Sequence, residues 1–323
     1  MPAQTVAPLP SGFHIGDYVI DRRIGGGGFS MVYLAFDMDG KTVAIKEYLP
    51  DGMVKRLEFG KVAPSSDDKE KSFRHGMKYF FDEGRTLANM RHPNVVEVVN
   101  FFRANDTVYM VMKYEQGKTL QRHIYEMKEE PMREGFVRSV FIQLLNGLRE
   151  VHAQRLLHFD IKPSNIYIRQ DGSPVLIDFG AARQTLTAEG TKLPPMYTPG
   201  FASPEHHRGK GGVDVDPNLL GPWSDIYSVG ASMYACLGGA GPQPADQRND
   251  KDKVVPARRA WSGRYSSDLL DTVDWCMRLN HMERPQSVFA LQKALQGEKL
   301  PEYRGEVPMF DQLKGALLRL AGR

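Results

Sequence analysis

The pattern of apolar residues changes once along the chain, near Gly117. Before this point, short β-branched and aromatic runs alternate with turn residues, which is typical of a small sheet. After it, apolar residues recur at helical spacing, most clearly over residues 133–152, and predict buried helices. A chain of 323 residues also tends to divide its core, since single domains rarely exceed about 250 residues. The sequence therefore predicts an α+β fold with a small β-rich lobe and a larger, mostly helical lobe.

The expected elements follow from this pattern. In the first part we expect one helix over residues 73–90 and strands over residues 18–24, 31–36, 42–45, 95–102 and 107–112. In the second part we expect short strands at 166–168 and 175–177 and helices at 133–152, 223–237, 268–279 and 286–295. Residues 1–17 suggest a flexible leader. Residues 300–323 suggest a tail, in which residues 309–320 could form an amphipathic helix.

Residues 47–72 are long, irregular and rich in proline and glycine. They form either a passive loop or a docking surface that positions the helix after them. We favour the passive loop, because long exposed insertions cost little free energy. The stretch over residues 209–221 is interpreted in the same way.

Composition excludes several classes of protein. The net charge is +3, from 42 basic and 39 acidic residues, which is too balanced to indicate nucleic acid or an anionic membrane as the main partner. No apolar run reaches the ~18 residues of a membrane-spanning helix. The two cysteines, Cys236 and Cys276, suggest reduced core thiols and a cytoplasmic location.

A glycine run and a lysine follow one another in the first part. The run from Gly25 to Gly28 joins two strands, where it is either a flexible turn or a loop whose N–H groups approach phosphate oxygens. Lys46 ends the next strand, within reach of phosphates beneath that loop. An ammonium group in a cleft needs an acidic partner. The helix over residues 73–90 offers Glu83 or its neighbour Asp82, and we favour Glu83.

Two polar segments follow the long helix of the second part. In the first, Asp160 can accept the proton of a hydroxyl, Lys162 can neutralise a migrating phosphoryl group, and Asn165 can ligate a hard cation. In the second, Asp178 follows a strand and precedes Phe179-Gly180, which suits Mg²⁺ that bridges phosphates. His158 in the first segment is interpreted as a packed core histidine.

These four features, in this order, resemble the eukaryotic-like (Hanks-type) protein kinases, and most closely the bacterial Ser/Thr members. The resemblance covers residues 18–296 and implies a two-lobed kinase domain over 18–299, with lobes at about 18–115 and 116–299. It implies Asp160 as base, Lys162 and Lys46 as stabilisers of the transferred group, and a Lys46–Glu83 pair. It implies Mg²⁺, or Mn²⁺, at Asn165 and Asp178.

The resemblance also implies an ATP site between the lobes. The loop that covers the phosphates would consist of Ile24, Gly25, Gly26, Gly27, Gly28, Phe29 and Ser30. The adenine ring would lie between Val32, Ala44 and Tyr167, near the backbone of Lys113 and Glu115, with Met112 at the back of the pocket. Two structural roles follow: Glu205 would pair with Arg284, and Asp225 would hold the catalytic loop.

The chain departs from the family pattern at two positions. Ser30 replaces the third glycine of the loop, which should leave phosphate contact intact. Phe159 stands where many members carry an arginine that pairs with a phosphate on the activation segment. We therefore hypothesise that activation does not use an arginine–phosphate lock. Lys162 and Thr198 resemble the Ser/Thr-specific pattern, and Thr185, Thr187, Thr191 and Thr198 are candidates for autophosphorylation.

Three functions compete at this stage. The first is an active protein kinase that uses ATP to phosphorylate Ser or Thr on other proteins, with a transient homodimer for autophosphorylation. The second is a pseudokinase scaffold that binds nucleotide without transfer. The third is a small-molecule kinase on a related fold. All the groups that transfer needs are present, and Ser203-Pro204-Glu205 and Thr198 suggest a protein substrate, so we favour the first.

Overall fold

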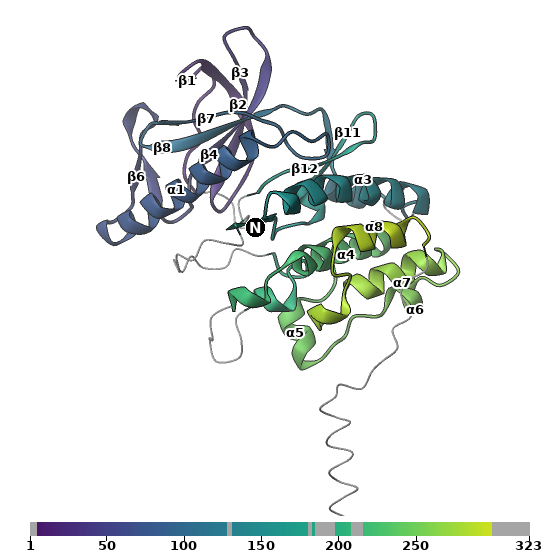
Figure 1. The fold of residues 1–323 in the computed structure, drawn as a ribbon. Helices are drawn as coiled ribbons and strands as arrows, with labels where there is room; N and C mark the ends of the chain where they lie inside the picture. Colours follow the sequence, from purple (N-terminus) through teal and green to yellow (C-terminus); the bar gives the residue numbers. More distant parts are fainter. Residues whose placement is uncertain (1–4, 128–130, 180–182, 185–197, 208–215, 299–323) are drawn as a thin grey trace, which may run out of the picture.

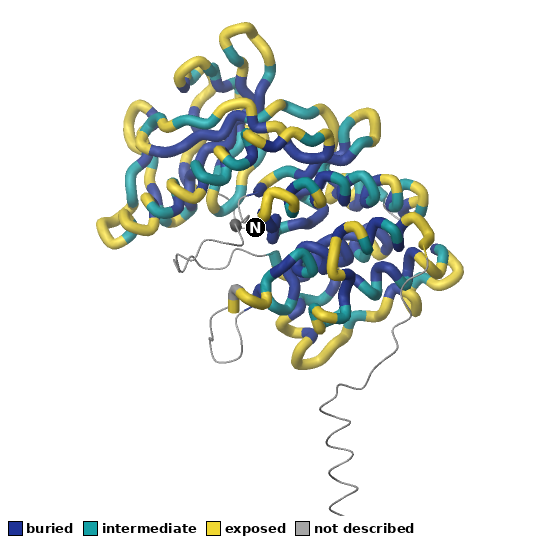
Figure 2. Tube along the Cα trace, viewed as in Figure 1, coloured by how far each residue is buried: buried dark blue, intermediate teal, exposed yellow. Residues whose placement is uncertain are grey.

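The computed structural model describes residues 5–127, 131–179, 183–184, 198–207 and 216–298. Figure 1 shows a β-rich lobe above a helical lobe, with α1 (Asp67–Ala88) on the upper sheet and the other helices below. This confirms the predicted α+β division into two lobes. Buried apolar residues from both lobes form one contiguous cluster, which Figure 2 shows in dark blue along the sheet and the central helices.

The small lobe contains a six-stranded antiparallel sheet with the order β1-β2-β3-β4-β8-β7. Its strands are β1 (His14–Ile15), β2 (Tyr18–Gly27), β3 (Ser30–Phe36), β4 (Thr42–Tyr48), β7 (Val98–Ala104) and β8 (Thr107–Lys113). The five predicted strands are all present. Strand β2 runs on through the glycine run to Gly27, because these glycines continue to pair with β3.

The large lobe is mostly helical. Its helices are α2 (Leu120–Glu126), α3 (Glu134–Ala153), α4 (Pro222–Gly238), α5 (Ala245–Asp250), α6 (Ala257–Ala260), α7 (Ser267–Cys276) and α8 (Val288–Leu295). Its short strands are β9 (Gly117–Thr119), β10 (Leu156–Leu157), β11 (Ile166–Arg169), β12 (Pro174–Leu176) and β13 (Arg183–Gln184). The predicted helices correspond to α3, α4, α7 and α8. Helices α2, α5 and α6 were not predicted, because 7, 6 and 4 residues are too few for a helical period to emerge.

Short 3-10 helices occur at η1 (Glu58–Gly60), η2 (Pro163–Asn165), η3 (Pro204–His206), η4 (Pro217–Leu219) and η5 (His281–Glu283). Helix α1 begins at Asp67 rather than at residue 73. Asp67, Asp68 and Glu70 lie in its first turn, where the helix dipole favours negative charge. The helix predicted at residues 309–320 lies outside the described residues.

Two expectations for the small lobe are wrong. The segment expected to be a passive loop forms a hairpin of β5 (Val54–Arg56) and β6 (Val62–Pro64), in which Val54 and Val62 are buried. The expected flexible leader is packed from residue 5 onward, with Leu9 and Ile15 3% and 2% exposed. Both segments bury apolar side chains that a solvated loop would leave in water, and that burial is favourable.

Candidate active site

The glycine run forms the distal part of the β2–β3 hairpin. Gly25 pairs with Val32, Gly26 with Met31 and Gly27 with Ser30, and the chain turns at Gly28 and Phe29. Gly26 has a φ of +145°, and a Cβ there would lie 2.9 Å from the carbonyl oxygen of Ser30. Only glycine therefore fits at this point. Val32 pairs in turn with Lys46 of β4, so the hairpin is directly adjacent to the lysine.

Lys46 is 4% exposed and forms an ion pair with Asp178, with 2.6 Å between Nζ and Oδ1. Its ammonium group also lies 5.5 Å from the centre of the Phe80 ring. Burial lowers the pKa of Lys46, but the charges of Asp178 and Glu83 outweigh it and leave the pKa above its usual value. The lysine therefore remains charged at the point where it bridges the two lobes.

The expected Lys46–Glu83 ion pair is not formed among the described residues. Glu83 lies near enough for its charge to act on Lys46, yet its buried Oε1 has no hydrogen-bond partner. Burial raises the pKa of Glu83 to about 7; the charge of Lys46 lowers it and that of Asp178 adds to the rise. Asp178 takes the lysine instead, because it approaches to contact distance from the opposite lobe.

Asp160, Lys162 and Thr198 form a closed triangle of contacts. Lys162 Nζ lies 2.7 Å from Asp160 Oδ2 and 2.7 Å from Thr198 Oγ1. The Thr198 hydroxyl donates to Asp160 Oδ1 at 2.7 Å. Asn165 donates through Nδ2 to the backbone carbonyl of Asp160 at 2.9 Å and to its carboxylate at 3.0 Å. The structure thus brings together Asp160, Lys162 and Asn165, as the sequence spacing predicts. It adds the hydroxyl of Thr198 to this group.

Asp225 of α4 holds the backbone of this loop. Its carboxylate is fully buried and accepts from the N–H groups of His158 and Phe159 at 2.9 and 2.8 Å. It also contacts His152 Nε2 at 2.8 Å. Burial raises the pKa of Asp225, but its contacts with His152 and His158 together outweigh burial, so the pKa lies below its usual value. The expectation that Asp225 supports the loop is confirmed.

Phe159 makes an aromatic contact with the segment that follows Thr198. Its side chain is 5% exposed and meets the His206 ring edge-on, with 4.6 Å between ring centres. The neighbouring His158 packs on Phe179 at 4.4 Å, and burial lowers its pKa. His158 is therefore a packed core histidine, as expected. Phe159 has a φ of +63°, a conformation that is costly for a bulky residue and is usually retained where the surrounding structure imposes it.

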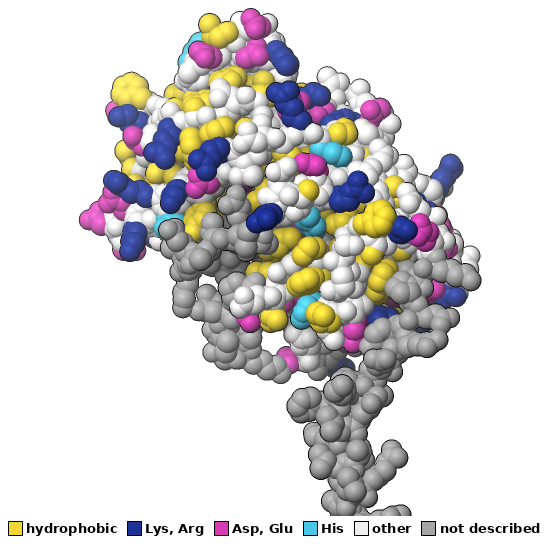
Figure 3. All heavy atoms as spheres, in the orientation of Figure 1, with side chains coloured by type: hydrophobic (Ala, Val, Ile, Leu, Met, Phe, Trp, Pro, Cys, Tyr) yellow, Lys and Arg dark blue, Asp and Glu magenta, His cyan; other side chains and the backbone are white. Residues whose placement is uncertain are grey.

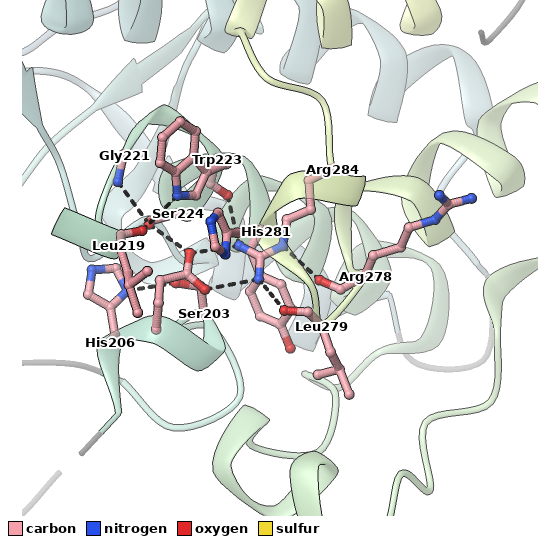
Figure 4. A network of polar contacts seen from close by, with 12 residues as sticks. Ser203, His206, Leu219, Gly221, Trp223, Ser224, Arg278, Leu279, His281 and Arg284 are labelled. Atoms are coloured by element: carbon pink, nitrogen blue, oxygen red, sulfur yellow. Dashed lines mark hydrogen bonds and ion pairs between the residues drawn. The ribbon is translucent and has the colours of Figure 1, made fainter. Parts of the chain in front are cut away.

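Glu205 and Arg284 form the expected ion pair. Arg284 donates to both carboxylate oxygens, at 2.8 and 3.0 Å, and its side chain is fully buried. Figure 4 shows the same guanidinium reaching the backbone carbonyls of Trp223, Arg278 and Leu279, which accept at 3.1, 2.7 and 2.9 Å. Together these contacts tie the segment after Thr198 to the helical lobe.

The remaining predicted residues lie on strands on either side of the connection between the lobes. Ala44 pairs with Met112 and Val43 with Lys113, so Ala44, Met112 and Lys46 lie along two neighbouring strands. Tyr167 lies below on β11, where its hydroxyl donates to the carbonyl of Gly117 at 2.9 Å.

Glu115 accepts from Arg169 through both carboxylate oxygens, each at 2.8 Å. Sequence reasoning missed Arg169. Arg169 lies two residues after Tyr167 in the same strand, so both side chains lie on the same face, and this spacing could have indicated its position near Glu115.

The family profile described as "Protein kinase domain" matches residues 18–296. A mouse protein named serine/threonine-protein kinase Nek1 is 27% identical over 88% of this chain, which covers 22% of that protein. The serine/threonine-protein kinase PrkC of Bacillus subtilis is 30% identical over 69% of this chain and 31% of its own length. The chain thus spans well under half the length of the curated relatives that it matches.

Solved structures show the same fold. The structure titled "PpkA-294 apo form" is 32% identical and aligns with a TM-score of 0.77 over 89% of this chain and 99% of its own. The kinase domain of Mycobacterium tuberculosis PknI aligns with a TM-score of 0.65 at 21% identity, over 90% of this chain and 99% of its own, and speaks for the fold alone.

Proposed function

This chain belongs to the protein kinase family, and we propose that it transfers the γ-phosphoryl group of ATP to Ser or Thr hydroxyls of protein substrates. The observation that carries the proposal is the triangle of Asp160, Lys162 and Thr198. In it, a carboxylate already accepts a hydrogen bond from a hydroxyl, beside an ammonium group that can offset phosphoryl charge. A substrate hydroxyl at this carboxylate would be oriented and deprotonated in the same way.

The chain's own groups divide the work. Asp160 takes the proton from the attacking oxygen, and Lys162 stabilises the transferred group. Lys46 neutralises the α- and β-phosphates once nucleotide displaces Asp178 from it, and Glu83 then becomes its available acidic neighbour. Catalysis of this kind depends mainly on positioning and charge, with no phospho-enzyme intermediate.

The donor set fits a hard divalent cation. Asn165 uses its amide N–H₂ toward Asp160, which leaves its side-chain oxygen to ligate, and the Asp178 side chain is 45% exposed. Oxygen ligands of this kind suit Mg²⁺ or Mn²⁺. The cation would neutralise phosphate charge between Asn165 and Asp178.

We assign the adenine ring to the space bounded by Val32, Ala44 and Tyr167, with Met112 behind it. The backbone of Lys113 and Glu115 would bind the adenine edge. The phosphates would lie beneath the hairpin from Ile24 to Ser30, whose glycines place no Cβ in the way. We propose that the kinase domain covers residues 18–299, as the family match over residues 18–296 suggests, with Leu9 and Ile15 of the preceding segment packed against it.

The decisive experiment is Asp160→Asn, assayed with labelled ATP, Mg²⁺ and a generic basic protein. Turnover should fall by about 10²–10⁴-fold, while nucleotide binding stays near that of the parent chain. Asp171→Asn, at the turn after β11 where the carboxylate caps Ser173, is the matched control and should stay active.

Full activity of Asp160→Asn would contradict the assignment of the base. ATP binding without transfer by the parent chain would indicate a scaffold, and label on small metabolites alone would indicate a small-molecule kinase.

Activation is proposed to be independent of an arginine–phosphate lock, because Phe159 packs on His206. Thr185, Thr187 and Thr191 lie outside the described residues. Replacing these three threonines together with alanine should leave most transfer activity. A near-total loss would disprove the idea.

Partners follow from the same proposal. On the face shown in Figure 3, basic and acidic side chains are interspersed, in keeping with protein substrates rather than nucleic acid. None of the helices among the described residues has the length and apolar character to cross a bilayer. A cytoplasmic location is proposed from the buried free thiols Cys236 and Cys276, and a transient homodimer would serve autophosphorylation.

A further inference from the structure

A second buried ion pair lies one residue from Lys46. Glu47 follows Lys46 on β4, and side chains alternate between the two faces of a strand. Lys46 contacts Asp178 of the other lobe, whereas Glu47 points to the outer face of the sheet. The hairpin β5–β6 and residues 5–15 cover that face, and Glu47 is 0% exposed.

The Glu47 carboxylate accepts four hydrogen bonds. Arg56 of the hairpin donates to both oxygens, at 2.9 and 2.7 Å. Tyr33 and Tyr109, from the strands on either side of β4, each donate a hydroxyl at 2.8 Å. This carboxylate therefore ties three sheet strands to the hairpin.

Arg56 uses every one of its N–H donors. Besides Glu47, it donates to the carbonyl of Ala7 at 2.8 Å, the carbonyl of Gly60 at 3.1 Å and the hydroxyl of Tyr33 at 3.3 Å. Gly60 has a φ of +77°, and a Cβ there would lie 2.5 Å from the Phe13 ring. The backbone thus turns at a glycine to bring its carbonyl to the arginine. The planar guanidinium of Arg56 can make all these hydrogen bonds in only one orientation. A lysine, with a single flexible ammonium group, would not reproduce them.

Three successive residues of β4 therefore hold three different parts of the molecule. Lys46 reaches Asp178 of the other lobe and Glu47 holds the hairpin. Tyr48 stacks on Phe73 and lies against Phe80, both of α1, with ring centres 5.7 and 5.6 Å apart. Strand β6 ends at Pro64 and α1 begins at Asp67, so the hairpin is also the covalent lead into the helix that carries Glu83.

We propose that Arg56 is a positioning residue for nucleotide binding: through Glu47 it fixes the end of β4, and so the place of Lys46 between Asp178 and Glu83. The inference rests on the proposed function, since it assumes that Lys46 contacts nucleotide phosphates. Arg56 itself contacts no reacting group. Its effect should therefore concern the phosphates and spare the adenosine part of the ligand.

The test compares two ligands on the full chain: Mg²⁺ with a non-hydrolysable imido analogue of ATP, and adenosine. Arg56→Met should raise the dissociation constant of the triphosphate about tenfold, the value of one charge-assisted hydrogen bond. The dissociation constant of adenosine should change less than about twofold. Arg74→Met is the matched control, because Arg74 pairs with Glu70 in an exposed ion pair of the same lobe. It should change neither constant.

A second variant separates positioning from stability. In Glu47→Gln with Arg56→Met no buried charge is left unpaired. The glutamine oxygen still accepts from one of the two tyrosine hydroxyls, and its amide group faces the other hydroxyl, whose oxygen can accept. Its thermal midpoint should return toward that of the parent chain while the selective loss of triphosphate affinity persists. Arg56→Lys should fall between the parent chain and Arg56→Met. If triphosphate affinity returns together with stability, Arg56 is only structural and the inference is wrong; this variant also decides the case where Arg56→Met does not fold.

The same binding measurements distinguish a failure of the proposed function from a failure of this inference. A parent chain that binds the triphosphate no better than adenosine, and is indifferent to Lys46→Met, would overturn the proposed function and this inference with it. A parent chain that prefers the triphosphate, with an Arg56→Met variant of equal preference, would overturn the inference alone.

Discussion

Two buried arginine–glutamate pairs, one in each lobe, use the same chemistry for different purposes. Arg284 binds both oxygens of Glu205 and three backbone carbonyls. Arg56 binds both oxygens of Glu47, two carbonyls and a tyrosine hydroxyl. Each guanidinium thus has all five donors satisfied, which is the condition under which a buried ion pair is tolerated.

The difference lies in what each pair joins. Glu205 and Arg284 are 79 residues apart in sequence and tie the segment after Thr198 to the helical lobe. Glu47 and Arg56 are nine residues apart and tie a local hairpin to the strand that carries Lys46. The first pair therefore supports the side of the cleft proposed for the protein substrate, and the second supports the side proposed for the nucleotide.

The largest expected effect tests whether the long-range pair is structural. Arg284→Met leaves Glu205 buried without its partner, and should lower the free energy of unfolding by about 3–5 kcal/mol. Chemical denaturation measures this. Arg258→Met, which removes an exposed pair with Asp271 at 3.7 Å, should cost under about 1 kcal/mol. Equal losses for the two variants would mean that burial does not set the value of the Glu205 pair.

Thr198 lies on the same segment as Glu205 but contacts the proposed catalytic residues instead of anchoring the segment. Thr198→Val keeps the shape of the side chain but removes the hydroxyl between Asp160 and Lys162. A hydrogen bond to a charged group is worth about 1.5–3 kcal/mol, so turnover should fall by about tenfold or more. Steady-state kinetics measure it. Thr198→Ser should retain activity, and a Thr198→Val enzyme as active as the parent would show that the triangle is not used.

A third test uses acid to break the long-range pair. Burial raises the pKa of Glu205, but the hydrogen bonds and charge of Arg284 outweigh it, so the folded-state pKa lies below its ordinary value of 4.5. The unfolded chain then binds protons first, and the free energy of unfolding falls as pH drops below about 4.5.

In Glu205→Gln the free energy of unfolding should fall less steeply with decreasing pH. Chemical denaturation at a series of pH values, from neutral downward, measures this. Glu70→Gln, which removes the exposed partner of Arg74, should leave the acid limb unchanged. A parallel shift of both curves would contradict the assignment.

The smallest expected effect concerns Glu83, which lies close enough to Lys46 for their charges to interact. Its folded-state pKa is about 7 against an ordinary value of 4.5, chiefly because of burial. The folded chain therefore holds this proton longer, and the group stabilises the fold below pH 4.5 and loses that contribution as pH rises toward about 7.

Glu83→Gln should remove this loss, so that the unfolding free energy of the variant falls less over the same pH range. An unchanged slope would place the Glu83 carboxyl in a more solvated position.

The two pairs also show how far sequence reasoning reaches. The Glu205–Arg284 pair and the support by Asp225 were expected from a family pattern, in which fixed motifs imply fixed neighbours. The Glu47–Arg56 pair was not, because it depends on the register of a hairpin that periodicity did not reveal. Likewise, the choice of Lys46 between Glu83 and Asp178 depends on how closely α1 approaches β4, and no spacing along the chain encodes that distance.

The covered outer face of the small sheet also bears on where the domain begins. The family match starts at residue 18, yet Leu9 is 3% exposed against this lobe and the Ala7 carbonyl satisfies one donor of Arg56. A protein that begins at residue 18 would expose the apolar surface that Leu9 covers. It would also leave one N–H donor of Arg56 without its acceptor. The cooperative folding unit is therefore larger than the recognisable homology.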